Sequence, residues 1–519
     1  MINRFPVKLP ENGSAMATIA FTVAFEGVEA RLVEVQCSVA AGLPGFTIVG
    51  LPDKAVNEAK ERVRAAFSAL SIALPSKRIT VNLSPADLPK EGSHFDLPIA
   101  LAVLAATEII PADELERIVS LGELSLDGRI VSVLGALPAA MAASEDDRSL
   151  ICPRDCGAEA AWIRSVPVFA AATLRDVINH LTGRAPLSTA QPGEIADGAA
   201  NADLADIKGQ ERARRALEIA AAGRHHLLMV GPPGAGKSML AARLPGILPP
   251  LTPIEALETS MIHSLAGLLK GGGISRTAPF RSPHHNASIP AMVGGGRGAK
   301  PGEVSLAHNG VLFMDEFPEL PRAVLETLRQ PIETGAVVIA RANAHIRYPC
   351  RFLLIAAANP CRCGYLADAG RACTRAPICG ADYMGKISGP LMDRFDLRIE
   401  VPAVPLTQLE SAAPGEPSVA VAQRVAAARM AQTRRFEDHP QIRVNADASG
   451  RVLEEIATPD AEGRDLALRA AEKLGLTARG YHRVLRTART IADLDGSAQV
   501  RSPHIAEAIG YRLAFVNGG

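Results

Sequence analysis

The feature that most restricts the fold of this chain of 519 residues is a glycine-rich octapeptide between an apolar run and a helical pattern. The octapeptide consists of Gly231, Pro232, Pro233, Gly234, Ala235, Gly236, Lys237 and Ser238. The apolar residues 227–230 predict a buried strand, and residues 238–244 predict a helix that Pro245 ends. A strand, a glycine-rich turn and a helix in this order are typical of an α/β nucleotide-binding domain.

The chemistry of the octapeptide fits a nucleoside triphosphate bound with Mg²⁺. Its glycines allow the backbone to curve around phosphate with the N–H groups pointing inward, and the following helix adds its positive end. Lys237 is long enough to reach the β- and γ-phosphates, and the hydroxyl of Ser238 is a ligand for Mg²⁺. An ordinary glycine-rich turn would not explain the Lys-Ser pair after the last glycine. We therefore expect ATP and Mg²⁺ as cofactors.

The bulk composition is that of a globular protein without a membrane span. The 55 basic and 55 acidic residues balance, so an anionic partner must be met by a local patch. No apolar run reaches the roughly 18 residues of a membrane span, and the first 13 residues lack a signal-peptide core. Eight cysteines, four of them close together, fit a reducing compartment better than a disulfide framework. These observations predict a cytoplasmic protein with no membrane partner.

The length predicts about three domains at about 150 residues each. We expect an irregular extension at residues 1–15 and an α/β domain at residues 16–183, where strand and helix patterns alternate. Residues 184–204 have the Pro, Gly, Ser and Ala composition of a linker. The nucleotide-binding core is expected at residues 205–401 and a helical region at residues 402–519.

Two further apolar runs end in polar residues that suit ATP hydrolysis. Residues 311–314 predict a buried strand that delivers Asp315 and Glu316. In that position Asp315 would hold Mg²⁺ and Glu316 would polarise the attacking water. A strand followed by a solvated acidic turn is the plainer alternative. Residues 352–358 predict another strand, after which the amide of Asn359 is placed to orient the water or contact the γ-phosphate.

Two arginines are candidates for contacts with phosphate. Arg394 lies in the segment Asp-Arg-Phe-Asp, and Arg479 opens a helical pattern in the C-terminal region. A guanidinium that faces phosphate stabilises the charge of phosphoryl transfer. Arg479, Arg483 and Arg486 also recur on one helix face, which fits a DNA contact, a subunit interface or solvent. Taken alone, each arginine is also explained as a surface residue.

Together, these motifs resemble those of the AAA+ ATPases in the magnesium-chelatase and MCM helicase branch. From about Met16 onward the chain resembles the bacterial YifB/ComM family more closely. The motifs that carry this second resemblance are 42–46 (GLPGF), 50–53 (GLPD), 283–285 (PHH), 306–310 (LAHNG), 328–331 (LRQP) and 359–361 (NPC). Residues 1–15 fall outside the resemblance, which makes Met16 a candidate for the start of the protein.

The resemblance implies an α/β fold with a P-loop AAA+ core, a helical C-terminal lid and an N-terminal Lon-protease-like domain of the S5 type. It further implies a homohexameric ring with ATP at the subunit interfaces, Arg394 as arginine finger and Arg479 as sensor 2. The family includes a DNA helicase that drives branch migration during natural transformation. The function that the resemblance implies is therefore that of an ATP-dependent motor on single-stranded or branched DNA.

In this branch of the AAA+ ATPases two insertions line the central pore, and both have candidate segments here. Residues 270–300 are rich in glycine and include Arg281 and Arg297. Residues 337–347 predict a hairpin that carries Arg341, His345 and Arg347 near its tip. Cationic loops of this kind suit contacts with DNA phosphates that do not depend on base sequence. Solvated loop charge is the plainer alternative.

Four cysteines within nineteen residues form a candidate metal site. They are Cys361, Cys363, Cys373 and Cys379, in a segment that also contains several glycines. Four thiolates satisfy tetrahedral Zn²⁺, and a short loop can close around one ion. The spacing is looser than that of two paired C-x-x-C motifs, so reduced cysteines without a ligand are the alternative. We expect a structural Zn²⁺.

Residues 90–96 and 121–129 resemble the Lon-type protease domain, which raises an ATP-dependent peptidase as a rival function. The position that matches the Lon nucleophile is His94, although Ser93 is adjacent. Residues 135–143, which would supply the general-base lysine, contain none, and a serine without a base is a poor nucleophile. We therefore expect the fold without peptidase chemistry. The third class of function is the motor subunit of a metal chelatase. The Lon-like domain and the cysteine cluster argue against it, because neither is expected in such a subunit.

Overall fold

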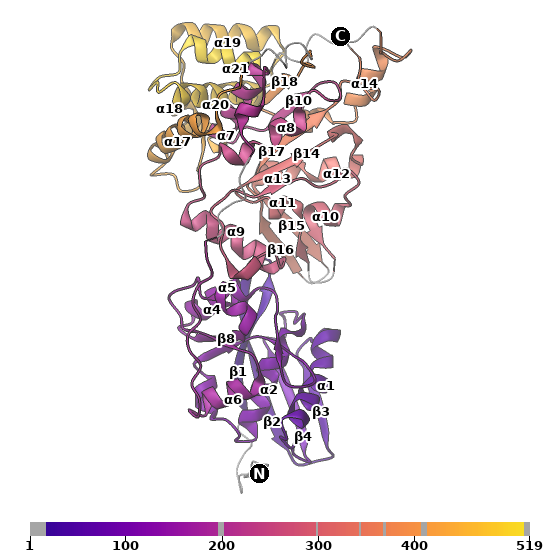
Figure 1. The fold of residues 1–519 in the computed structure, drawn as a ribbon, viewed down its shortest axis with the longest axis vertical. Coiled ribbons are helices and arrows are strands. Elements are labelled where there is room, and N and C mark those ends of the chain that lie inside the picture. Colours follow the sequence, from indigo (N-terminus) through magenta and orange to yellow (C-terminus); the bar gives the residue numbers. More distant parts are fainter. Residues whose placement is uncertain are drawn as a thin grey trace.

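The computed structural model describes residues 17–195, 202–296, 299–341, 344–366, 370–405 and 413–512. The molecule is elongated, with the strands and helices of residues 18–181 at one end and a second sheet with its helices at the other (Figure 1). The C-terminal helices pack beside this second sheet, far from the first (Figure 1). The extension predicted at residues 1–15 lies outside the described residues. No described helix is both long and apolar enough to span a membrane.

The first part of the chain is a mixed seven-stranded sheet in the order β3-β4-β2-β1-β5-β8-β9. Its strands are β1 (Thr18–Glu26), β2 (Glu29–Ala40), β3 (Gly45–Val49), β4 (Arg78–Ser84), β5 (Ile118–Ser120), β8 (Ser149–Pro153) and β9 (Val168–Ala171). A separate two-stranded sheet pairs β6 (Glu123–Leu124) with β7 (Ile130–Val131). Strand β7 ends at Val131, where its pairing with β6 stops.

Helices cover both faces of this first sheet. They are α1 (Lys54–Ala69), α2 (Asp96–Ala106), α3 (Ala112–Leu115), α4 (Ala136–Glu145), α5 (Gly157–Ala160) and α6 (Leu174–Leu181). Adjacent residues of β1 show the period of two: Ala24 belongs to the core with α1, α2 and α6, and Val23 to the core with α4 and α5. Because both faces are covered, the part has two apolar cores.

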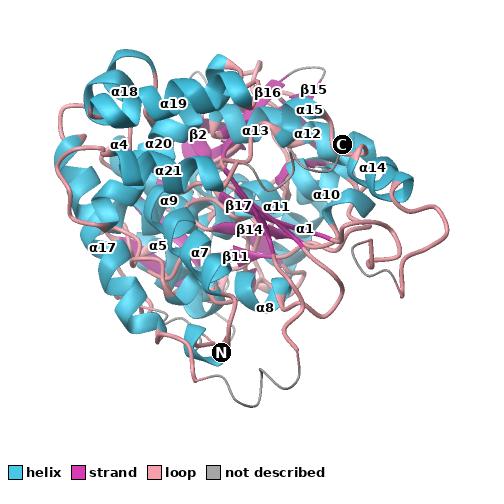
Figure 2. Cartoon of the chain, turned by 90° about the horizontal axis from the view of Figure 1, so that it is seen from above, coloured by secondary structure: helices cyan, strands magenta, loops and turns pink. Residues whose placement is uncertain are grey.

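The second part is built on a five-stranded sheet whose pairings are all parallel, in the order β11-β14-β17-β10-β18. The strands are β10 (Leu227–Val230), β11 (Phe280–Arg281), β14 (Val311–Met314), β17 (Leu353–Ala358) and β18 (Leu397–Glu400). Seen from above, helices surround these strands (Figure 2). The predicted strands at 227–230 and 311–314 are confirmed, and the one at 352–358 begins one residue later. Their carboxyl ends meet at one edge of the sheet.

The helices of this second part are mostly short. They are α7 (Glu211–Gly223), α8 (Lys237–Ala241), α9 (Pro253–Leu265), α10 (Ile289–Val293), α11 (Glu303–Leu306), α12 (Arg322–Thr327), α13 (Arg329–Thr334), α14 (Ile378–Met384) and α15 (Gly389–Met392). The helix predicted at 238–244 ends earlier, at Ala241. Pro245 lacks the N–H that the carbonyl of Ala241 would need as its helical partner, which explains the early end.

Two hairpins project from the second part. One pairs β12 (Gly294–Gly295) with β13 (Lys300–Pro301), and the other pairs β15 (Ala336–Arg341) with β16 (Ala344–Pro349). The second hairpin confirms the hairpin predicted at 337–347. It lies at the junction with the first part, where β16 passes the β1–β2 turn (Figure 1).

The C-terminal region is helical, as expected. It comprises α17 (Ser418–Arg435), α18 (Gly450–Ala457), α19 (Ala461–Lys473), α20 (Ala478–Leu494) and α21 (Ser502–Gly510). Helices α17 and α20 both pack on α7, which shares their apolar core. Arg489 is buried here, and its guanidinium donates to Asp493 at 2.9 Å. We call α17–α21 the lid.

The two α/β parts are joined by polar as well as apolar contacts. The indole Nε1 of Trp162 donates to the carbonyl of Gly272 at 2.8 Å. Glu159 accepts a hydrogen bond from the hydroxyl of Ser264, which lies on α9, and burial raises the pKa of its carboxyl group. A partly buried carboxyl group with a partner across the junction favours one fixed arrangement of the two parts.

Candidate nucleotide site

The glycine-rich octapeptide forms the turn between β10 and α8 at the carboxyl edge of the parallel sheet. All four residues of β10 are buried, which fixes where the turn begins. Gly234 and Gly236 have φ values of 76° and 87°, in the left-handed region that favours glycine. Helix α8 begins directly after Gly236, so its N-terminal N–H groups face the turn. The octapeptide therefore has the geometry of a phosphate-binding loop.

Lys237 is held inside this loop by three oxygen atoms. Its ammonium donates to the carbonyls of Gly231 at 2.7 Å and Pro232 at 2.9 Å, and to Oδ1 of Asn359 at 3.1 Å. Burial lowers its pKa, and the nearby carboxylates of Asp315 and Glu316 oppose that shift. Asn359 follows β17, the neighbour of β10, so the adjacent strands bring lysine and amide together as the sequence suggests. An incoming phosphate would find the ammonium already in place.

The two acids predicted after β14 lie at the same edge of the sheet. Oδ2 of Asp315 accepts a hydrogen bond from the hydroxyl of Ser238 at 2.7 Å. Its other oxygen, Oδ1, accepts from the backbone N–H of Glu316 at 2.9 Å. A hydroxyl and a carboxylate in contact are an oxygen pair that suits Mg²⁺, which prefers hard ligands. The residues present therefore fit the metal that the loop implies.

Glu316 is oriented by a histidine to which the sequence analysis gave no role. Nδ1 of His285 lies 3.1 Å from Oε2 of Glu316. His285 comes from the segment that follows β11, the edge strand beside β14. Glu316 also has a φ of 48°, which is uncommon for a residue other than glycine and turns its side chain out of the strand direction. The Pro-His-His motif was visible in the sequence, but its pairing with Glu316 requires the fold.

His285→Ala should lower kcat of ATP hydrolysis about tenfold, because Glu316 keeps its carboxylate but loses a partner that orients it. His284→Ala is the matched control, since His284 is the neighbouring histidine and its Nδ1 accepts from the backbone of Asn286. Steady-state ATPase rates check this prediction. An equal loss in both variants would mean that His285 supports the loop in general and does not orient Glu316.

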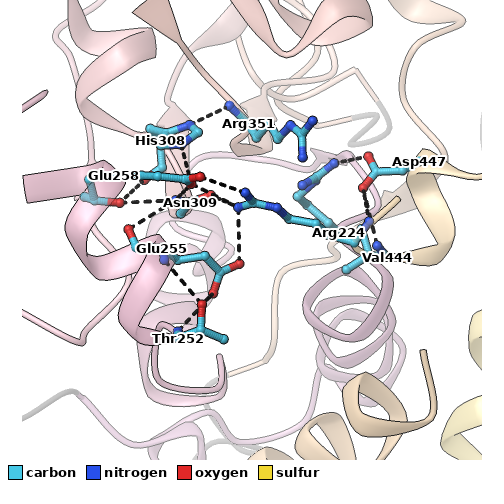
Figure 3. A network of polar contacts seen from close by, with 11 residues as sticks. Arg224, Thr252, Glu255, Glu258, His308, Asn309, Arg351, Val444 and Asp447 are labelled. Carbon is cyan, nitrogen blue, oxygen red and sulfur yellow. Dashed lines mark hydrogen bonds and ion pairs between the residues drawn. The ribbon is translucent and has the colours of Figure 1, made fainter. Parts of the chain in front are cut away.

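A polar network supports the strand that carries these acids (Figure 3). The backbone N–H of Arg351 donates to Nδ1 of His308 at 3.0 Å, so Nε2 carries the hydrogen and donates to Glu258 at 3.4 Å. Arg443 of the lid donates to the same carboxylate at 2.9 Å. These bonds, His308 first, hold the pKa of Glu258 below its usual range against the effect of burial. The network ties α9 and the lid to the start of β14.

The two candidate arginines lie at the opposite edge of the sheet from the phosphate-binding loop. The backbone of residues 394–396 passes the amino end of β10, where the N–H of Asp396 donates to the carbonyl of His226 at 3.0 Å. The four residues of β10 span about 13 Å. Arg394 and Arg479 both face Glu333, the latter at 3.9 Å. The two arginines therefore lie close to each other and far from the phosphate-binding loop of their own chain.

The residues proposed for DNA contact have different surroundings. His345 and Arg347 are exposed on β16 of the hairpin, and Arg341 is at the end of β15. Arg281 forms a two-bond ion pair with Glu303, at 2.7 Å for each bond, so its guanidinium is already neutralised. Arg297 lies outside the described residues. The hairpin is thus the better-supported candidate of the two insertions.

The four clustered cysteines lie close together, and their closest contacts are two thiol pairs. The Sγ atoms of Cys361 and Cys363 are 3.0 Å apart, and those of Cys373 and Cys379 are 3.3 Å apart. Around Zn²⁺ at 2.3 Å from each sulfur, the thiolates would be about 3.8 Å apart. Within the described ranges, no group of three or more His, Cys, Asp or Glu side chains is placed to hold a metal ion. The predicted zinc site therefore has no support from the structure.

The residues that match the Lon nucleophile region have structural partners. The hydroxyl of Ser93 donates to the carboxylate of Glu123, and Nε2 of the buried His94 lies 2.9 Å from the carbonyl of Val23. The ammonium of Lys90 donates to the carbonyl of Pro85. Serine and lysine thus each bond to a different group.

Family descriptions from known proteins match most of the chain. "Magnesium chelatase, subunit ChlI" matches residues 203–409, and its C-terminal counterpart matches residues 415–512. "Subunit ChlI of Mg-chelatase" matches residues 33–156, in the first α/β part. That match does not name the Lon protease, so the Lon-like assignment stays a prediction.

Individual relatives match over very different lengths. Competence protein ComM of Haemophilus influenzae is 45% identical over 500 residues, which cover 95% of this chain and 97% of that protein. The protein YifB of Escherichia coli is 43% identical over 496 residues, with 95% and 97% covered. The magnesium-chelatase 38 kDa subunit of Rhodobacter capsulatus is 27% identical over 212 residues, which cover 38% of this chain and 54% of that protein.

Proposed function

The chain belongs to the magnesium chelatase-like family of AAA+ ATPases that contains ComM and YifB, and from this premise we propose that it is an ATP-driven motor that remodels DNA as a homohexamer. The observation that carries the DNA part is the 45% identity to ComM over 95% of the chain. ComM is named for competence, the capacity to take up DNA. Incoming DNA must exchange strands with the chromosome, so branch migration in the cytoplasm is the proposed activity.

Hydrolysis of ATP follows from the residues at the carboxyl edge of the sheet. Lys237 would exchange its carbonyl partners for the β- and γ-phosphate oxygens, and Ser238 and Asp315 would hold Mg²⁺. The metal supplies charge that neutralises the phosphates. Glu316, oriented by His285, accepts a proton from the attacking water. Asn359, which bonds to Lys237, is positioned to contact the γ-phosphate or that water.

The arginines complete the site of a neighbouring subunit. Arg394 and Arg479 lie a strand's length from the phosphate-binding loop of their own chain, so they serve a nucleotide only across an interface. A ring places the amino edge of one sheet against the carboxyl edge of the next. In that arrangement Arg394 stabilises transition-state charge and Arg479 contacts the bound phosphates.

The hairpin β15–β16 is the proposed contact with DNA. Arg347 and His345 are exposed on it, and Arg341 ends its first strand. Contacts of this kind with phosphate release counterions, so DNA binding should weaken steeply as salt concentration rises. They do not depend on base sequence, which suits a motor that tracks along a strand.

Arg341→Ala combined with Arg347→Ala should reduce branch migration at least about tenfold, because two phosphate contacts are lost from each subunit. ATP hydrolysis without DNA should change little, since neither residue belongs to the nucleotide site. Displacement of a labelled strand from a four-way junction, measured over a range of salt concentrations, checks both statements.

Arg451→Ala combined with Arg469→Ala is the matched control, because these lid arginines are exposed and pair with acids one helical turn away. Equal migration by the hairpin variant and the control would move the DNA contact elsewhere. The segment 270–300 would then be the next candidate.

The other two functions make different predictions. The three family matches and the 27% identity to a chelatase subunit favour a metal-chelatase motor as second candidate, in which protoporphyrin and Mg²⁺ and not DNA would couple to hydrolysis. For a Lon-like peptidase, casein digestion should vanish in Ser93→Ala. The contacts of Ser93 with Glu123 and of Lys90 with Pro85 argue against that chemistry.

A further inference from the structure

One carboxylate faces both of the arginines that the proposed ring would place on a neighbour's nucleotide. Glu333 lies near the end of α13, five residues before the middle of β15. Its Oε1 forms an ion pair with Nη2 of Arg394 and is 3.9 Å from Nη1 of Arg479. The side chain of Glu333 is 48% exposed, whereas that of Arg394 is only 8% exposed. A surface acid thus neutralises a nearly buried guanidinium.

The cavity beside Glu333 contains more cationic donors than acceptors. It has a volume of about 370 Å³ and is lined by arginines 224, 479, 483 and 486, by histidines 226 and 482, and by the acids Glu333, Asp396 and Asp447 among others. Asp396 already accepts from Arg483 at 2.7 Å, and Asp447 pairs with Arg224. Glu333 is therefore the acid that remains for Arg394 and Arg479.

Two buried guanidinium nitrogens here lack an acceptor. Among the described residues, the Nε atoms of Arg394 and Arg486 are buried and have no hydrogen-bond partner. A buried guanidinium nitrogen without an acceptor is costly, because the charge cannot be removed by deprotonation. The guanidinium of Arg394 has two acceptors, Glu333 at one end and the carbonyl of Pro390 at the other, and neither reaches its Nε. The remaining donors call for an anion with several acceptor oxygens that enters from the exposed side.

Phosphate meets that requirement better than a carboxylate does. A terminal phosphate has three acceptor oxygens and more charge, and its bonds to guanidinium are among the stronger ones in proteins. The carboxylate of Glu333 is itself half exposed to water, so exchanging it for phosphate costs less than losing a fully buried partner would. The same arginines thus have a weak acceptor in their own chain and a strong one on any nucleotide that reaches them.

We propose that Glu333 is a positioning residue. In the separate subunit its carboxylate binds Arg394 and Arg479, and when the ring closes the γ-phosphate of the neighbour's ATP replaces that carboxylate. The proposal rests on the action of these arginines across the interface. Glu333 keeps Arg394 folded against its own chain before assembly. It also competes with ATP, so ring closure requires the phosphate to displace it.

Glu333→Gln should lower the ATP concentration needed for half-maximal ring formation at least threefold, because the competing charge is gone. The kcat at saturating ATP should change less than twofold, since the displaced carboxylate takes no part in the closed site. Without nucleotide, the variant should unfold at a lower temperature than wild type, because Arg394 loses its partner. With ATP bound the two melting temperatures should agree. Sedimentation and ATPase titrations on the full chain measure these quantities.

Glu326→Gln is the matched control, because Glu326 is an acid on the adjoining α12 that pairs with Arg329 at 2.7 Å. A double-mutant cycle adds the decisive comparison: in an Arg394→Ala background, Glu333→Gln should no longer change the ATP requirement. An unchanged or raised ATP requirement in Glu333→Gln would overturn the proposal. If Arg394→Ala left ATP turnover intact, the trans site itself would fail, which separates the two ideas.

Discussion

Glu316→Gln should bind ATP with nearly unchanged affinity and hydrolyse it at least about 100-fold more slowly than wild type. The amide keeps the size of the side chain but cannot accept the proton of the attacking water, and a positioned base contributes a factor of this order. The phosphate contacts of Lys237 and the oxygen pair of Ser238 and Asp315 are untouched. Equilibrium binding of a fluorescent nucleotide and a single-turnover assay measure the two quantities.

Glu319→Gln provides the control for this variant, because Glu319 follows three residues later and pairs with Lys386 at 3.4 Å. It should hydrolyse ATP at close to the wild-type rate. Turnover near normal in Glu316→Gln would remove this residue from the mechanism. The role of His285 as its partner would fall with it.

Arg394→Ala should bind ATP and lose most of kcat, with a loss on the order of 1,000-fold, the scale found for arginines that act across an interface. Neither Arg394→Ala nor Glu316→Gln should be active alone. Mixed in equal amounts, they should regain activity at about one interface in four, where the intact acid of one subunit meets the intact arginine of the next. ATPase titration of one variant with the other measures this rescue.

Absence of rescue in rings shown to be mixed would assign Arg394 a role within its own chain. The structure argues against such a role, because a strand's length separates Arg394 from the phosphate-binding loop. Lys386→Ala, which removes an exposed cation eight residues earlier in the chain, is the control for unspecific weakening of the ring.

Local patterns predicted the elements of the nucleotide site well. Two runs of four apolar residues, one before the octapeptide and one before Asp315, have the length and composition of buried strands in a parallel sheet. Both form such strands in the structure. The hairpin at β15–β16 followed from two apolar stretches around a polar turn. The predicted end of α8 was wrong because Pro245 has no N–H to donate to the carbonyl of Ala241, four residues earlier.

Contacts between side chains far apart in the chain could not be predicted from the sequence. Arg281 has the sequence surroundings of a free loop cation, yet Glu303, twenty-two residues later, neutralises it. His285 and Glu316 meet because β11 and β14 are neighbours in the sheet, and Glu333 meets Arg394 because α13 folds against the segment before β18. Such contacts depend on strand order, which no local periodicity encodes.

The measurement that tests the central claim most directly is the ATPase rate of the purified full chain with Mg²⁺ and ATP, alone and with single-stranded, duplex and four-way-junction DNA. A DNA motor should hydrolyse ATP several-fold faster with DNA, most with the strand or junction on which it moves, and the stimulation should fall steeply with salt. Rates that DNA leaves unchanged, but that unfolded protein or protoporphyrin increases, would contradict the account.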